Sequence, residues 1–275
     1  MRRTSALDRS PQLVSVHRMA FVQPQVPNAK VGLGHPLFKF IEEAYRVFSY
    51  PRPQSTGVCE LCCMDAKIEA DFFNPKITEL PLNYVQDWFQ GAYTRDEMPK
   101  TTWAYLLPRI LEILAADEDP SPIGREVSLN RFETGNPKNW SMNEWKVLDK
   151  FQKAFLRREI VRLSDFLDDT VCMFGIAGWS IRSLLEQVTA TPDEQLAQRL
   201  WHDWCDCVPG RESVWISAFW ESPNNSTVFD FYTSREMHTR MEAVALSDRS
   251  TTELTAKASA VVNVIEANAN WVSQR

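Results

Sequence analysis

A chain of 275 residues with 44% hydrophobic side chains is long enough to bury a large core, and this balance is typical of a globular protein. The formal net charge of −6 and the lack of a long basic stretch argue against nucleic-acid binding, and no apolar run reaches the ~18 residues that a membrane span requires. No apolar stretch follows the basic start Met1-Arg2-Arg3, so we expect a soluble protein of the reducing cytoplasm.

The first third of the chain is predicted to consist of an irregular arm followed by helices. Residues 1–34 carry Pro and Gly without helical periodicity, which predicts a flexible N-terminal arm. Apolar residues then recur every three to four positions from Pro36 to Phe48, which predicts a helix that ends at Tyr50-Pro51-Arg52-Pro53. The same periodicity predicts that residues 35–275 form a single helical domain, with a possible division into two parts near 117–140. Further helices are expected over 65–73, 82–93 and 101–116.

Three sequences have the pattern of a capping box, in which a hydroxyl side chain precedes Glu by three residues at the start of a helix. They are Ser141-Met-Asn-Glu144, Thr191-Pro-Asp-Glu194 and Ser250-Thr-Thr-Glu253. Each predicts a helix start. Pro108 lies within the stripe of residues 101–116, where it predicts either a kink or a junction between two shorter helices.

The later part of the chain is also predicted to be mainly helical, over residues 145–160, 163–174, 181–188, 193–207, 213–220, 229–246 and 252–271. One stretch admits a second interpretation. Val214–Trp220 and Thr227–Thr233 flank a Pro-Asn-Asn turn, so a short hairpin near 214–233 competes with helix. The predicted fold class is therefore all-α, an irregular multi-helix bundle or an array of stacked helix pairs.

Several segments between Phe48 and Arg162 resemble an uncharacterised family of bacterial helical proteins of unknown function. The resemblance rests on Tyr50-Pro51-Arg52-Pro53, Cys59-Glu-Leu-Cys62, Leu106-Leu107-Pro108-Arg109-Ile110-Leu111-Glu112 and a helix that starts at Trp140–Trp145. It implies a bacterial, cytoplasmic, helical protein and assigns no functional residue.

The six Cys residues suggest one metal site. Cys59 and Cys62 have the spacing with which two thiolates bind zinc from a tight turn, and a tetrahedral site needs two further ligands. His202 and Cys205 are three positions apart on a predicted helix, so they share a face and could supply them. Buried free cysteines, which behave as small hydrophobic residues, are the competing interpretation.

No catalytic signature is recognised, and we expect no catalytic residue. None of His17, His35, His202 and His238 lies in a known motif, and no Gly-rich phosphate loop or dinucleotide fingerprint occurs. The acidic groups 112–119 and 165–169 are interpreted as solvated helix faces, although paired carboxylates can also bind cations or transfer protons.

Three functional hypotheses follow from these patterns. The first is a helical protein that acts through protein–protein interaction, for which ten Trp and fifteen Phe supply aromatic contact area. An inhibitor resembling an immunity protein or antitoxin is one form of it. The second is a zinc-binding structural module, and the third is an enzyme of unrecognised class. The expected partner is another protein, not nucleic acid or membrane, and the sequence does not fix the oligomeric state.

Overall fold

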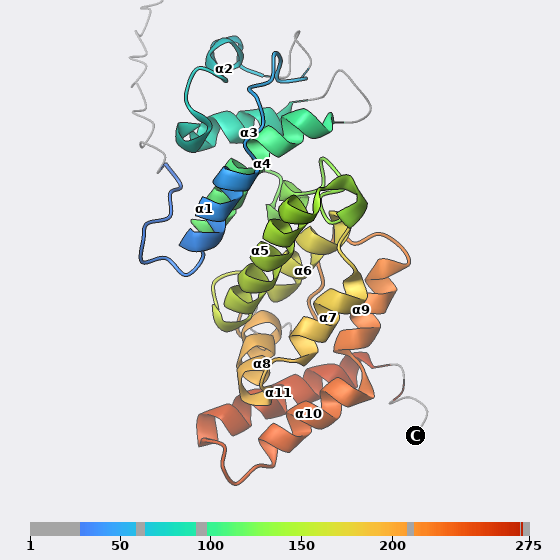
Figure 1. Cartoon of the computed structure of the whole chain (residues 1–275). Helices are drawn as coiled ribbons and strands as arrows, with labels where there is room; N and C mark the ends of the chain where they lie inside the picture. The colour runs from blue at the N-terminus through green and yellow to red at the C-terminus, as the bar shows by residue number, and fades with distance from the viewer. Residues whose placement is uncertain (1–27, 59–63, 92–97, 208–211, 270, 272–275) are drawn as a thin grey trace, which may run out of the picture.

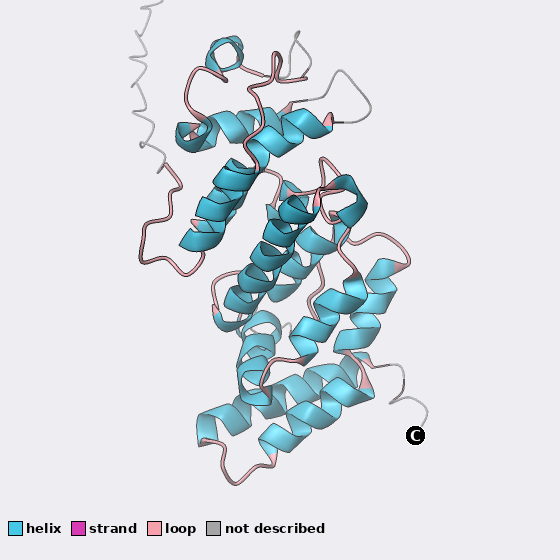
Figure 2. Cartoon of the chain, in the orientation of Figure 1, coloured by secondary structure: helices cyan, strands magenta, loops and turns pink. Residues whose placement is uncertain are grey.

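The structure is a computed structural model that describes residues 28–58, 64–91, 98–207, 212–269 and 271. Within these residues the regular elements are helical and no strand forms, which confirms the all-α prediction (Figure 2). The helices stack in an elongated array that follows the chain, with α1 to α4 at one end and α10 and α11 at the other (Figure 1). Their bounds are α1 Phe38–Val47, α2 Ala66–Asp71, α3 Leu82–Gln90, α4 Lys100–Ala115, α5 Met142–Val161, α6 Leu167–Ile176, α7 Ile181–Thr189, α8 Asp193–Trp201, α9 Asn224–Tyr232, α10 Arg235–Ala245 and α11 Thr252–Asn268.

The centre of the N-terminal half is α4, which is buried along almost its whole length. Trp103, Leu107 and Ile110 are fully buried, and α1 packs against both α4 and α5. The helix runs unbroken through Pro108, so the expectation of two shorter helices is wrong. Burial on all sides stabilises the helix by more than the hydrogen bond that Pro108 cannot donate.

The first of the three predicted capping boxes is formed. The Ser141 side chain accepts a hydrogen bond from the Glu144 backbone N–H, and the Glu144 carboxylate accepts one from the Ser141 backbone N–H. This closed pair of bonds fixes the start of α5.

The other two predicted boxes are wrong in register. The residue before α8 is Pro192, which has no side-chain cap, and the Thr191 hydroxyl donates to the carbonyl of Gln187 in the preceding helix instead. Helix α11 is capped by Thr251, whose side chain accepts from the Leu254 N–H. In both places a neighbouring helix end competes for the hydroxyl that the pattern assigned to the cap.

The segment 213–233 follows neither of its predicted forms in full. Residues 213–221 are extended and turn-like, so the helix expected over 213–220 is wrong, and the second half of the proposed hairpin is helix α9. The Ser217 backbone N–H and the Trp220 indole N–H donate to Asp168, and the Ser217 hydroxyl donates to Glu126. Because carboxylates of α6 and of the preceding segment accept these hydrogen bonds, the N–H and O–H groups are satisfied without the backbone hydrogen bonds of a helix or a β-ladder.

The C-terminal half is a second packed group in which α11 lies against both α8 and α10. The helix expected over 229–246 is divided into α9 and α10, and Ser234 caps α10 by accepting from the Met237 N–H. The chain continues from α8 into one turn of π-helix, His202–Asp206. No helix among the described residues has the length and apolarity needed to cross a bilayer.

Candidate functional site

An open groove lies between α7 and α9, and described residues line it. Its volume is about 630 Å³, and α7, α9 and the start of α10 enclose it. Helix α7 buries Leu184, Leu185 and Val188, and Leu185 lines the groove together with the half-buried Ile181, one helical turn away. Phe231 of α9 is half-buried on the other side, so the floor of the groove is apolar.

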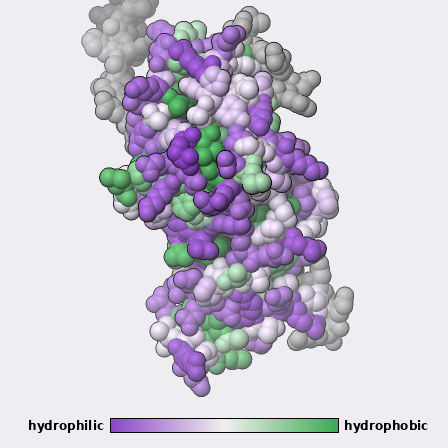
Figure 3. Space-filling view, in the orientation of Figure 1, coloured by the Kyte–Doolittle hydropathy of each residue, from purple (hydrophilic) through white to green (hydrophobic). Residues whose placement is uncertain are grey.

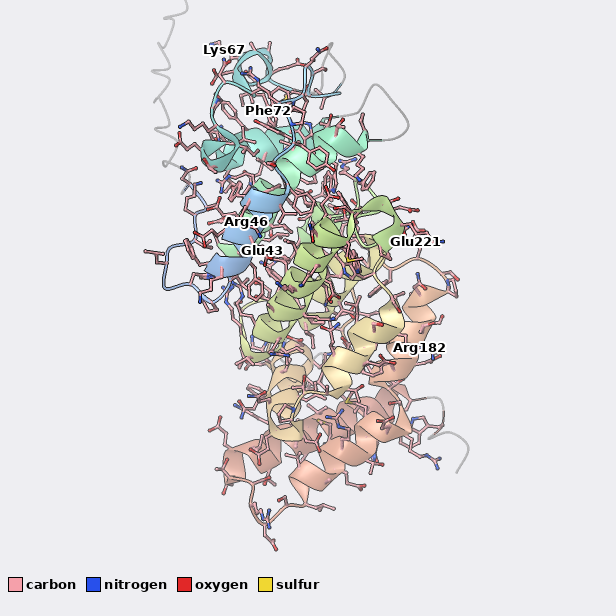
Figure 4. All side chains as sticks on the ribbon, in the orientation of Figure 1. Glu43, Arg46, Lys67, Phe72, Arg182 and Glu221 are labelled. Atoms are coloured by element: carbon pink, nitrogen blue, oxygen red, sulfur yellow. The ribbon has the colours of Figure 1, made fainter. Side chains whose placement is uncertain are left out.

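Charged side chains surround this apolar floor without neutralising one another. Arg182 and Glu186 on α7 and Glu236 on α10 are exposed, and none of the three forms an ion pair with another described residue. Asn224 lines this groove and also an adjoining cavity of about 380 Å³ that contains Glu221. Arg182 and Glu221 lie on the side of the molecule that α7 and α9 form (Figure 4).

A group of three carboxyls lies where segment 213–221 crosses α6. Asp168 is 2% exposed, and its Oδ2 accepts hydrogen bonds from the Ser217 N–H at 2.7 Å and the Trp220 indole at 2.8 Å. Glu126 accepts from the Ser217 hydroxyl at 2.7 Å, and Asp169 interacts with the Glu126 carboxyl. We call Glu126, Asp168 and Asp169 the carboxyl cluster.

None of the three carboxyls forms an ion pair with a cation among the described residues, and two of them, Asp168 and Asp169, have raised pKa values. The neighbouring Arg125 forms ion pairs with Asp119, Glu159 and Asp165 instead. Burial raises the pKa of Asp168 to about 6, against the hydrogen bonds from Ser217 and Trp220, which lower it. Burial and the adjacent Glu126 raise the pKa of Asp169 to about 7.

The carboxyl cluster corrects the interpretation of residues 165–169 as a solvated acidic face. Segment 213–221 contacts both aspartates at the start of α6: Ser217 and Trp220 donate to Asp168, and the Trp215 indole N–H donates to Asp169 at 3.4 Å. The only sequence signal for burial is that Asp168 lies between apolar Leu167 and Val171, both of which are buried.

A buried ion pair lies beside the carboxyl cluster. Arg199 on α8 is fully buried and donates to both carboxylate oxygens of Asp203 and to the carbonyls of Glu159, Arg162 and Asp165. Asp203 also accepts from the Leu167 N–H at the start of α6. These bonds satisfy the donors of the guanidinium, so this pair joins α5, α6 and α8 and is structural.

Two of the residues that carry the family resemblance, Arg109 and Glu112, have structural roles. Arg109 is fully buried and donates to the carbonyls of Leu80, Ala29 and Asn28 and to the carboxylate of Glu112 at 2.8 Å. Glu112 is 5% exposed, so its expected place on a solvated acidic face is wrong. Its carboxylate also accepts from the Tyr45 hydroxyl at 2.7 Å and from Lys30 at 3.2 Å, and no local sequence pattern indicates these distant partners.

The predicted zinc ligands lie in two different situations. Cys59 and Cys62 fall outside the described residues. The His202 Nδ1 lies 3.0 Å from an Asp203 carboxylate oxygen, and Cys205 is half-buried, where burial raises the pKa of its thiol to about 11. No group of three or more His, Cys, Asp or Glu side chains in the described parts of the chain is arranged to bind a metal ion. The four-residue zinc site stays a prediction.

Comparison of the chain with protein-family models, curated proteins and solved structures found no match. The resemblance to a bacterial family therefore remains a prediction, as do the cytoplasmic location and the absence of catalytic residues.

Proposed function

We propose that this protein acts through protein–protein interaction, and that the groove between α7 and α9 is the contact surface. The observation that supports this proposal is an apolar floor that the described parts of the chain leave uncovered. Side chains such as Ile181 and Phe231 lose contact with water when a partner covers them, which is the main favourable term in protein association. An immunity-type inhibitor is one form of such a protein, in which the captured partner is a toxin.

The groove combines an apolar floor with the charged side chains of Arg182, Glu186 and Glu236 at its rim. Most of the visible face of the molecule is polar, with smaller apolar patches between charged side chains (Figure 3). An apolar centre with a charged rim is the usual arrangement of a protein interface, because the centre supplies affinity and the rim supplies selectivity.

Photo-crosslinking within cells tests the proposal. A crosslinking amino acid at Thr227, an exposed residue that lines the groove, should capture a discrete protein, whereas the same amino acid at Lys153, an exposed residue of α5, should not. The Ala190→Trp variant fills the groove from an exposed position and should abolish the captured product. Equal capture from Thr227 and Lys153, or capture that survives Ala190→Trp, would remove the groove as the contact surface.

A further inference from the structure

The shape of the α7–α9 groove favours a helix over a small molecule as its ligand. Each of the two helices has nine residues, so the walls are about 13 Å long. The groove is open along one side, so a small molecule would remain in contact with water, whereas ligand pockets bury most of the surface of a drug-sized ligand. An amphipathic helix suits an open groove, because it buries one apolar stripe and leaves its polar face in solvent.

The apolar contacts of the groove have helical spacing. Ile181 and Leu185 are four residues apart on α7, and Thr227 and Phe231 are four residues apart on α9. Positions four apart lie on one helix face, so α7 presents an apolar row of Ile181 and Leu185, and α9 faces it with the ring of Phe231 and the side chain of Thr227. A partner helix with apolar residues at positions i, i+3 or i+4, and i+7 can insert between them.

The charge around the groove determines which helix fits. The carboxylates of Glu186 and Glu236 line the groove against the single guanidinium of Arg182, and the carboxylate of Glu221 lines the adjoining cavity. All four side chains are exposed, and the ion pairs formed among the described residues involve none of them. The rim is therefore negative, and it favours a positively charged partner both during approach and in the complex.

From these three observations we infer that the partner segment is a basic amphipathic helix, with Lys or Arg flanking an apolar stripe and one acidic residue opposite Arg182. This inference rests on the proposed interaction function and names the chemistry of its partner. A second copy of this chain is a poorer fit, because a symmetric contact would place one acidic rim against the other.

Binding of designed peptides to the full-length protein tests the inference by fluorescence polarisation. Three helix-forming peptides share one composition of apolar residues: one is flanked by Lys, one is flanked by Glu, and one is flanked by Lys with the apolar spacing scrambled. The Lys-flanked peptide should bind about tenfold more tightly than the Glu-flanked one, since at least two charge pairs change sign. The scrambled peptide should bind weakly, because its apolar residues no longer share one face.

Charge-reversal variants supply the second measurement. The order of the Lys- and Glu-flanked peptides should reverse in Glu186→Lys/Glu236→Lys. It should be unchanged in Glu42→Lys/Glu242→Lys, which alters the same number of exposed glutamates away from the groove. Equal binding of the two peptides, a preference that does not reverse, or binding of neither peptide while a fluorescent fatty acid saturates the groove would overturn the inference.

The outcomes separate this inference from the proposed function. If the crosslink at Thr227 captures a protein through an acidic or non-helical segment, the inference fails and the interaction function stands. If Thr227 captures no protein, the interaction function fails, whatever the peptides do.

Discussion

Two groups of buried ionisable side chains lie side by side in this protein and differ in one respect. Arg199 and Asp203 form a pair whose donors and acceptors are satisfied, whereas the carboxyl cluster of Glu126, Asp168 and Asp169 has hydrogen-bond donors but no described cation. Burial alone therefore does not determine whether a buried carboxyl is charged; its partners do. A paired charge is a structural link, and an unpaired carboxyl retains a proton to a higher pH.

Tyr232 lies where these two groups meet. It is 1% exposed on α9, and burial, followed by the nearby carboxylates of Asp168 and Asp203, raises the pKa of its hydroxyl well above the ordinary value. The hydroxyl therefore remains protonated over the pH range in which Asp168 and Asp169 titrate. Substitutions can perturb the ion pair and the carboxyl cluster separately.

Removing the cation of the paired group should have the largest effect. Arg199→Met leaves Asp203 buried without its guanidinium and frees three carbonyls, so we expect a loss of about 3–5 kcal/mol in the free energy of unfolding, measured with urea. Lys153→Met removes a surface pair with Asp149 and is the control, with an expected change below about 1 kcal/mol. A similar small change in both variants would show that the Arg199 pair does not hold α5, α6 and α8 together.

The carboxyl cluster should make stability fall as the pH rises. The pKa of Asp168 is about 6 in the folded protein against an ordinary 3.8, so the folded state binds the proton more tightly than the unfolded state. The resulting stabilisation is complete below pH 3.8, is lost between about pH 4 and 6, and is absent above that range. For Asp169 the loss extends to about pH 7.

Asp168→Asn isolates this effect from the other titrating groups. The variant should be more stable than the wild type by about 2–3 kcal/mol at pH 8 and should lose that advantage by pH 4, because it carries no buried charge at either pH. Asp230→Asn changes an exposed residue of α9 and should follow the wild-type curve. The measurement is urea unfolding across this pH range, and parallel curves for all three proteins would contradict the expected role of Asp168.

Displacing the donor to Asp168 should have an intermediate effect. A Cβ atom at Gly175 would lie 2.3 Å from Cη2 of Trp220, so Gly175→Ala must push the indole from its place over α6. We expect a loss of about 1–3 kcal/mol by thermal unfolding. Gly32→Ala meets open space and is the matched control. If the two variants are equally stable, Trp220 does not depend on close contact with α6.

The groove should contribute least to stability. Arg182→Ala removes an exposed side chain for which no hydrogen bond or ion pair is found among the described residues, so we expect a change below about 0.5 kcal/mol in the free energy of unfolding. Affinity for the Lys-flanked peptide should rise in the same variant, because the single positive charge of the rim is lost. A large loss of stability would show that Arg182 belongs to the core rather than to the groove.

The candidate groove could be predicted only in part from the sequence. The periodicity of residues 181–188 predicted helix α7 and its apolar face, but the other wall was assigned to a longer helix or to a hairpin. Ile181 and Phe231 are 50 positions apart, and nothing local in the sequence indicates that they face one cavity. The acidic residues around the groove were not singled out, because isolated glutamates on helices are ordinary surface residues.

By itself the sequence determined that the chain is helical, since apolar residues every three to four positions can be buried together only on coiled segments. It also determined the start of α5, because the bonds between Ser141 and Glu144 are local. Only the tertiary structure decided that residues 213–221 lie extended across α6, that Asp168 is buried, and that Thr251 rather than Ser250 caps α11. These features depend on partners distant in the sequence, and the free energy of those contacts exceeds the small differences between local conformations.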